Sequence, residues 1–235
     1  MKGHLQAGAL AMGIELDQIA LARFARFAEM MAEWNARMNL TRIPPCDVVP
    51  LHCLDSLALL VAVEPPLGSR LIDVGAGAGL PGLAVKIARP DLRVSLLDAT
   101  RKRVDFARAA VQELGLDDVE CIHGRAEDLA RTPQHRAGYS VAAARAVARM
   151  NVLVEWLAPF ARVGGLIVAL KSEAVDAELE QARPAIARLG AEMVRVVPVT
   201  LPGVDIRRKL IVLRQARPAP PAFPRPASET KRHPL

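Results

Sequence analysis

The stretch Leu71–Gly82, with the sequence LIDVGAGAGLPG, decides the fold class of this chain. A short apolar run contains one acid, Asp73, and then glycines recur at every second position. Pro81 suits the first turn of a helix, where its missing N–H group is not needed. The order predicts a strand, a tight turn and a helix. This arrangement builds a pocket for a ligand that has a nucleotide part.

The chain after residue 68 alternates between apolar runs and amphipathic stretches. We expect strands near 70–74, 93–98, 118–123, 139–144, 165–170, 191–199 and 207–213. Helices are expected near 81–89, 101–115, 150–162 and 173–189. Such alternation predicts an α/β fold, a doubly wound, seven-stranded and mainly parallel sheet with helices on both faces. The last two strands are joined by too few residues for a crossover, so they should form an antiparallel hairpin.

Three segments follow from this pattern. Residues 1–67 form a helical extension with a loose leader over the first fourteen residues, an amphipathic helix over 15–38 and another helix near 47–61. Residues 68–214 form the ligand-binding domain. Residues 215–235 are a basic, Pro-rich tail, which we expect to be extended because it offers little apolar surface to bury.

The second helix carries His52, Asp55 and Ser56 on one face. A Ser/His/Asp triad normally gathers its members from separate elements, so a polar cluster that fixes the helix is the better interpretation. Cys46 and Cys53 near His52 match no common zinc spacing, and we predict no metal site.

Composition limits the setting and the partners. The chain has three cysteines, an odd and small number that does not suit a disulfide framework, so we expect a cytoplasmic protein. No run of about 18 apolar residues occurs in the sequence, so we expect no membrane segment. The formal net charge is +6, and residues 201–235 hold eight Lys and Arg against two acids. This excess favours an anionic partner such as nucleic acid.

Two templates fit the glycine turn. Residues 77–82 match the dinucleotide fingerprint G-x-G-x-x-G, with Asp98 at the expected distance. Asp73, Gly75, Gly77 and Gly79 match D-x-G-x-G-x-G, the pattern of S-adenosylmethionine methyltransferases. The acid and the extra glycine before the fingerprint, together with the terminal hairpin, favour the second template. A turn without a cofactor is a third interpretation, although so many glycines weaken a loop unless a ligand needs close approach.

Candidate contacts follow from the ends of the strands. Asp98 can accept hydrogen bonds from ribose hydroxyls, and the segment Gly124–Asp128 can border an adenine or simply begin a helix. Arg145 ends the fourth strand and needs a partner amid apolar neighbours. Arg101, Lys102 and Arg103 begin the helix near 101, where positive charge opposes the helix dipole, and this suggests that they contact phosphate. We expect further RNA contacts from the basic tail and from Lys171, Arg207, Arg208 and Lys209.

Motifs along most of the chain resemble one family. They are WNARMNLT (Trp34–Thr41), HCLDSL (His52–Leu57), IDVGAGAGLPG (Ile72–Gly82), LLDATRKRVDF (Leu96–Phe106), GRAED (Gly124–Asp128), ARAVA (Ala144–Ala148), LKS (Leu170–Ser172) and RRKLIVLR (Arg207–Arg214). The chain is similar, over about 15–214, to the small-subunit ribosomal RNA guanine-N7 methyltransferase G family, also called glucose-inhibited division protein B. It departs from the commonest forms at Ala78, where many members have Pro, and at Ser172, where many have Gly.

The resemblance implies methyl transfer from S-adenosylmethionine to N7 of a specific guanine in 16S ribosomal RNA, as naked RNA or in an assembling small subunit. It places cofactor contacts at Gly75, Leu80, Ala126, Glu127 and Arg145, with Arg145 orienting cofactor or base. We expect a monomer. A small-molecule methyltransferase, a nicotinamide-dependent oxidoreductase and a non-enzymatic RNA-binding protein are the competing functions. The first is disfavoured by the basic excess and by the lack of an apolar substrate lid.

Overall fold

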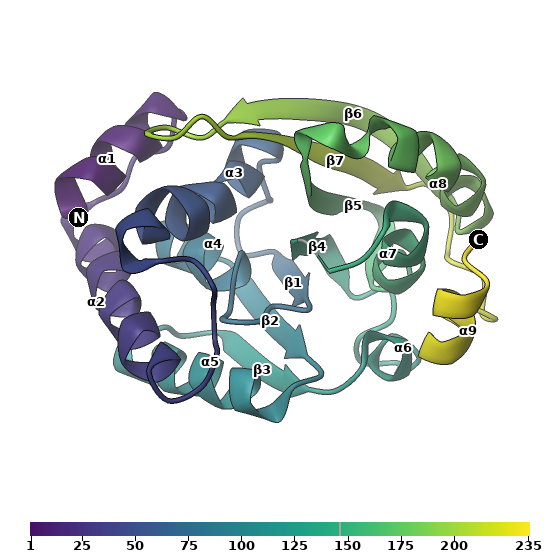
Figure 1. The fold of residues 1–235 in the computed structure, drawn as a ribbon. Helices are drawn as coiled ribbons and strands as arrows, with labels where there is room; N and C mark the ends of the chain where they lie inside the picture. The colour runs from purple at the N-terminus through teal and green to yellow at the C-terminus, as the bar shows by residue number, and fades with distance from the viewer. Residues whose placement is uncertain (146) are drawn as a thin grey trace.

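The computed structural model describes residues 1–145 and 147–235, apart from the side chain of Lys231. Over these residues the chain forms one seven-stranded sheet with strand order β3-β2-β1-β4-β5-β7-β6 (Figure 1). The strands are β1 (Arg70–Val74), β2 (Arg93–Asp98), β3 (Val119–His123), β4 (Tyr139–Arg145), β5 (Ala161–Ser172), β6 (Ala191–Thr200) and β7 (Arg207–Gln215). Strands β1 to β5 are parallel, and β7 is antiparallel to both β5 and β6. The predicted fold class and the terminal hairpin are therefore confirmed.

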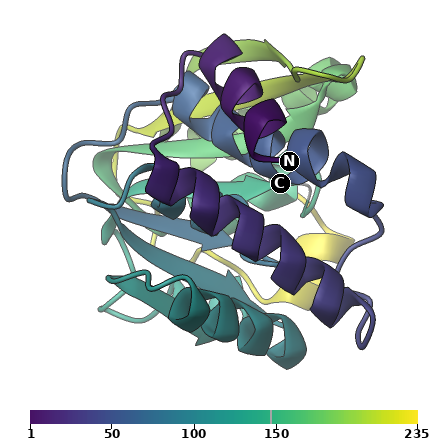
Figure 2. The ribbon, with the colours of Figure 1, turned by 90° about the vertical axis from the view of Figure 1, so that its left-hand side faces the viewer.

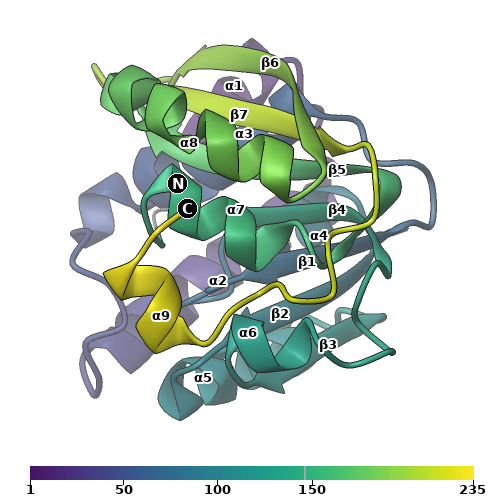
Figure 3. The same cartoon turned by 90° about the vertical axis from the view of Figure 1, so that its right-hand side faces the viewer.

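Helices cover both faces of the sheet. One face buries apolar side chains from α1 (Lys2–Ala11), α2 (Gln18–Asn35), α3 (Asp55–Ala62), α4 (Gly82–Ala88) and α5 (Arg101–Glu113), and Figure 2 shows α2 crossing this face. The other face buries side chains from α6 (Ala126–Leu129), α7 (Met150–Leu157) and α8 (Asp176–Arg188), with α9 (Ala227–Arg232) outside them (Figure 3). No helix in the described part of the chain is long and apolar enough to cross a membrane.

Helix α2 of the N-terminal extension is capped at both ends by residues of its own segment. The Asp17 carboxylate accepts a hydrogen bond from Ala20 N at 2.7 Å, which caps α2. Asn35 closes the other end, since its Oδ1 accepts from Leu40 N and Thr41 N at 2.8 and 2.9 Å. A short 3₁₀ turn, η1 (Pro45–Asp47), and a π-helical turn, η2 (Val49–Leu54), then lead into α3, where a helix over 47–61 was expected.

The prediction of a loose leader is wrong. Residues 2–11 form α1, in which Leu5, Gly8 and Ala9 are buried on one face. A Cβ added at Gly8 would lie 2.5 Å from Leu54 Cδ1, so the helix approaches η2 closely at this glycine. The helix forms because this small apolar stripe finds a partner surface on a later segment.

The prediction of an extended tail is also wrong. Phe223 and Thr230 are buried, and the Arg225 guanidinium contacts the fully buried Glu155 carboxylate at 2.6 Å. Arg136 donates to the carbonyl oxygens of Ala219, Pro220 and Phe223, and Arg131 donates to those of Ala222 and Pro224. The tail packs because its backbone and Arg225 satisfy charged groups of the domain, which its apolar content alone does not indicate.

Helix α7 ends at Leu157, earlier than the predicted 162. Ala161 already pairs with Tyr139 of β4, and a register shift follows between Tyr139 and Val141. Strand β5 is therefore longer than predicted, and the chain between α7 and β5 is short.

Candidate functional site

The glycine turn is tied to the end of the neighbouring strand. Gly75 N and Ala76 N both donate to Leu97 O, at 2.8 and 3.0 Å. Gly75 and Gly77 have φ values of +76° and +59°, in the left-handed region that side chains disfavour. A Cβ added at Gly77 would meet only Gly75 O, at 4.0 Å, so the turn leaves open space where a ligand can approach the backbone.

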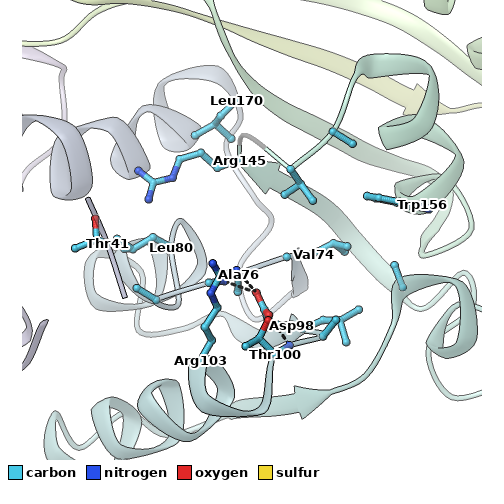
Figure 4. Close-up of a pocket in the computed structure, with 18 of the residues that line it drawn as sticks. Thr41, Val74, Ala76, Leu80, Asp98, Thr100, Arg103, Arg145, Trp156 and Leu170 are labelled. Carbon is cyan, nitrogen blue, oxygen red and sulfur yellow. Dashed lines mark hydrogen bonds and ion pairs between the residues drawn. The ribbon is translucent and has the colours of Figure 1, made fainter. Parts of the chain in front are cut away.

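A cleft of about 940 Å³ opens at the carboxyl ends of the parallel strands, beside this turn (Figure 4). This volume is at the upper end of the range for small-molecule sites. Seven of the nine predicted cofactor residues line it: Gly75, Gly77, Leu80, Asp98, Ala126, Glu127 and Arg145. The other two, Asp73 and Gly79, are not part of its lining.

Asp73 lies fully buried beneath the turn. Its Oδ2 accepts a hydrogen bond from Gly82 N at 2.7 Å, at the first residue of α4. No donor among the described residues reaches its Oδ1. Burial raises the pKa of Asp73 to about 7, although the hydrogen bond from Gly82 and the charge of Arg145 favour the ionised form. In this structure Asp73 therefore holds the turn to the start of α4.

Asp98 ends β2 and faces the cleft, with a side chain that is 8% exposed. Its Oδ2 accepts from Gly77 N at 2.9 Å and its Oδ1 from Thr100 N at 2.8 Å. The Arg103 guanidinium lies 3.7 Å away. A carboxylate has about four acceptor positions, so Asp98 keeps capacity for two more donors, such as the hydroxyls of a ribose.

Helix α6 supplies the wall after β3. Ala126 and Glu127, its first two residues, are buried and line the cleft with Arg125. Trp156 of α7 also lines the cleft and was not predicted, because nothing in its local sequence sets it apart from a core residue. Glu127 stands at the positive end of the α6 dipole, where an acid is favourable.

Arg145 has the partner that its sequence position requires. Its Nη1 donates to Leu51 O at 3.1 Å and to Asp55 Oδ2 at 3.2 Å. The other oxygen of Asp55 accepts from Arg208 Nε at 2.8 Å, so one buried carboxylate joins an arginine of β4 to one of β7. All three side chains line the cleft on the side of α3.

His52 completes the polar cluster predicted on this helix face. Its Nε2 lies 2.8 Å from Thr41 Oγ1 and its Nδ1 lies 3.3 Å from Arg145 Nη2. Burial, followed by the charge of Arg145, lowers the pKa of His52 to about 4, so the ring is neutral at pH 7. Ser56 Oγ is buried and has no hydrogen-bond partner within the described chain, so the three side chains form no relay. Nearby, Cys53 is buried and Cys46 is exposed.

The seven predicted RNA-binding residues fall into two groups. Arg101, Lys102 and Arg103 are exposed at the start of α5. The others form ion pairs within the chain: Lys171 with Glu178, Arg207 with Glu173, Arg208 with Asp55, and Lys209 with Asp176. Within the first group Arg103 also contacts Asp98, at 3.7 Å, whereas Arg101 and Lys102 form no ion pair with any described residue and remain open to an anionic partner. The second group is already engaged.

Known sequences identify the family. The family described as rRNA small subunit methyltransferase G matches residues 20–210. The chain belongs to this family. A protein named Ribosomal RNA small subunit methyltransferase G from Roseiflexus castenholzii is 42% identical over 229 residues, which cover 97% of each chain. A protein of the same name from Alkaliphilus oremlandii is 37% identical and covers 100% of this chain and 99% of its own.

Solved structures are similar in fold. TYW2 of P. horikoshii, in complex with MeSAdo, aligns with a TM-score of 0.55 at 13% identity, covering 70% of this chain and 62% of its own. Geranyl diphosphate methyltransferase in complex with SAM aligns with a TM-score of 0.54 at 16% identity, covering 68% and 84%. Membership of a methyltransferase family decides between the two templates of the glycine turn in favour of the methyltransferase pattern.

Proposed function

We propose that the protein transfers the methyl group of S-adenosylmethionine to N7 of a guanine in small-subunit ribosomal RNA. The observation that carries this proposal is the match to the methyltransferase G family over residues 20–210, in a chain whose cleft is built on the predicted glycine turn. The basic surface beside that cleft suits an RNA substrate.

The cofactor occupies the side of the cleft between β1, β2 and α6. Asp98 accepts hydrogen bonds from the ribose hydroxyls with the capacity that Gly77 and Thr100 leave. Gly75 and Gly77 admit the methionine part close to the backbone, and Ala126 and Glu127 border the adenine. When bound, S-adenosylmethionine supplies an electrophilic methyl group on sulfur.

The target base enters from the opposite side, where Arg145, His52 and Asp55 meet. Guanine N7 has a free lone pair at neutral pH, so no group has to remove a proton before methyl transfer. The neutral His52 and the paired Asp55 fit this requirement, since neither needs to act as a base. The protein contributes by holding the donor carbon and the acceptor nitrogen in line and in contact. Arg145 orients the cofactor or the base.

The RNA reaches the cleft along the start of α5. Arg101, Lys102 and Arg103 are exposed there, and Arg103 also lines the cleft. N7 lies in the deep major groove of an A-form helix, where side chains cannot reach it, so the target guanine lies in a loop or a distorted region, or is turned outward. The enzyme acts as a cytoplasmic monomer on rRNA or on an assembling subunit.

The test is a methylation assay with labelled S-adenosylmethionine on purified small-subunit rRNA and on assembled subunits, followed by mapping of the modified nucleotide. We expect label at N7 of one guanine, and the two substrates show which form is recognised. A parallel titration with NAD should give no binding. Absence of label in both substrates, with S-adenosylmethionine bound by the enzyme, would contradict the rRNA assignment. Absence of S-adenosylmethionine binding would contradict the assignment as a whole.

A further inference from the structure

Residues 147–149, which lead into α7, form one wall of the cleft. Val147, Ala148 and Arg149 all line it. Val147 faces the glycine turn so closely that a Cβ added at Gly75 would lie 2.8 Å from Val147 Cγ2. The position of this loop therefore sets how much room is left beside the first glycine of the turn.

The loop is held from β5 by Lys171. The side chain of Lys171 is 9% exposed, and its ammonium donates to Ala148 O at 2.6 Å and to Glu178 Oε1 at 2.5 Å. Hydrogen bonds between charged groups in such a site are stronger than those between neutral groups. Two of the three N–H donors of the ammonium are committed in this way, and the charge is paired with Glu178 at the wall of the cleft.

Helix α8 holds the loop at a second point. Glu178 Oε1 also accepts a hydrogen bond from Met150 N, at the first residue of α7. The residue that precedes α7, Arg149, provides no side-chain cap, so Glu178 satisfies a backbone N–H group that a helix start leaves open. The carboxylate also lies at the positive end of the α7 dipole. Arg149 itself donates to Gln181 of α8 at 2.6 Å.

We propose that Lys171 and Glu178 are positioning residues of the cofactor site. Their ion pair joins β5 and α8 to residues 147–150 and fixes this loop against the glycine turn, and neither residue contacts RNA. This inference rests on the proposed function, because the ligand whose binding it affects is S-adenosylmethionine. It replaces the sequence-based prediction that Lys171 binds phosphate with a role inside the domain.

The experiment compares Lys171→Met and Glu178→Gln with the full-length wild-type protein. The control is Glu180→Gln on the same helix, because Glu180 is exposed and pairs only locally, with Arg183 at 2.6 Å. Calorimetric titration gives the Kd of S-adenosylmethionine, steady-state assays give the KM of rRNA, and urea denaturation shows that each variant is folded. We expect the Kd to rise about tenfold in Lys171→Met, in line with the loss of a charge-assisted hydrogen bond. The KM of rRNA should stay unchanged, and Glu180→Gln should bind like the wild type.

Glu178→Gln is the milder change, since a glutamine can still accept from Met150 N but loses the charge that pairs with Lys171. Its Kd should rise less, and the double variant should bind no more weakly than Lys171→Met, because both changes break one pair. The inference is overturned if Lys171→Met binds the cofactor like the wild type while its KM for rRNA rises with a changed salt dependence. If Lys171→Met does not fold, a wild-type Kd in Glu178→Gln overturns it equally. A wild-type protein that fails to bind S-adenosylmethionine contradicts the proposed function instead.

Discussion

Replacing Gly75 with alanine tests how the glycine turn and the loop after β4 share the cleft. Gly75 has φ +76°, which costs an L-residue roughly 1–2 kcal/mol. The new Cβ would lie 2.8 Å from Val147 Cγ2, whereas carbon atoms in contact are about 3.5–4 Å apart. Val147 must therefore move by about 1 Å. Crowding costs about 1–3 kcal/mol in a well-packed core, which is an upper limit for a side chain that is 36% exposed. We expect the free energy of unfolding to fall by more than the backbone cost alone and by at most about 5 kcal/mol.

A matched control separates backbone strain from crowding. Gly68 has φ +67°, and a Cβ added there would meet nothing within 4 Å. Gly68→Ala should therefore lose only the backbone part, roughly 1–2 kcal/mol, and should leave the Kd of S-adenosylmethionine unchanged. Gly75→Ala should also weaken cofactor binding by at least about tenfold, because the displaced Val147 lines the cleft. Urea denaturation and calorimetric titration give the two quantities.

A second substitution locates the cause. Val147→Ala removes both methyl groups that face Gly75, and Val147 is exposed enough, at 36%, for this truncation to cost little by itself. In the Gly75→Ala background, Val147→Ala should restore most of the free energy of unfolding that crowding removes, and part of the cofactor affinity. A double-mutant cycle measures this recovery as a coupling energy. Equal losses in Gly75→Ala and Gly68→Ala, with no recovery on adding Val147→Ala, would refute the argument.

Three more outcomes are expected. Asp98→Asn should weaken S-adenosylmethionine binding about 10- to 100-fold in a titration, because the ribose loses a charged acceptor. Replacing Arg101 and Lys102 with glutamine should lower the slope of log Kd for rRNA against log salt by about 0.7 for each phosphate that the protein no longer neutralises, with cofactor Kd unchanged. The pKa of Asp73 is about 7 in the folded protein and 3.8 ordinarily, so the folded state holds the proton of Asp73 more tightly than the unfolded state does. The stabilisation that this proton gives is complete below about pH 4 and is lost as pH rises toward 7. Denaturation curves should therefore show wild-type stability falling relative to Asp73→Asn between pH 4 and pH 7, by at most about 1.4 kcal/mol per pH unit; parallel pH profiles would contradict this.

The centre of the fold was predictable because local signals there agree with one another. Strands β1 and β2 occupy the predicted residues, since each is an apolar run with clear limits. The hairpin of β6 and β7 followed from the length of one connection. The need of Arg145 for a partner was predictable, because a charge near an apolar strand requires compensation. The identity of that partner was not, since Asp55 lies 90 residues earlier.

The parts of the fold that could not be predicted from the sequence depend on contacts between distant segments. Helix α1 is short and has a weak apolar stripe, and it is packed because later segments offer it a surface: η2, where Leu54 lies against Gly8, and α2. The tail looks unable to fold until Glu155 is known to be buried beneath Arg225. In both cases the stabilising partner belongs to another part of the chain, which local propensity does not report.

The cations show why charge in a sequence is a poor guide to charge on a surface. The last 35 residues carry an excess equal to the net charge of the whole chain, which suggested that the tail attracts RNA. In the fold, however, Arg207 faces Glu173 in the turn before α8, Lys209 faces Asp176 at the start of α8, and Arg225 faces Glu155. These pairs reduce the field that the segment presents to an anion, because opposite charges at contact distance cancel beyond a few ångströms in water. RNA attraction near the cleft should therefore come mainly from the start of α5, where Arg101 and Lys102 form no ion pair with any described residue.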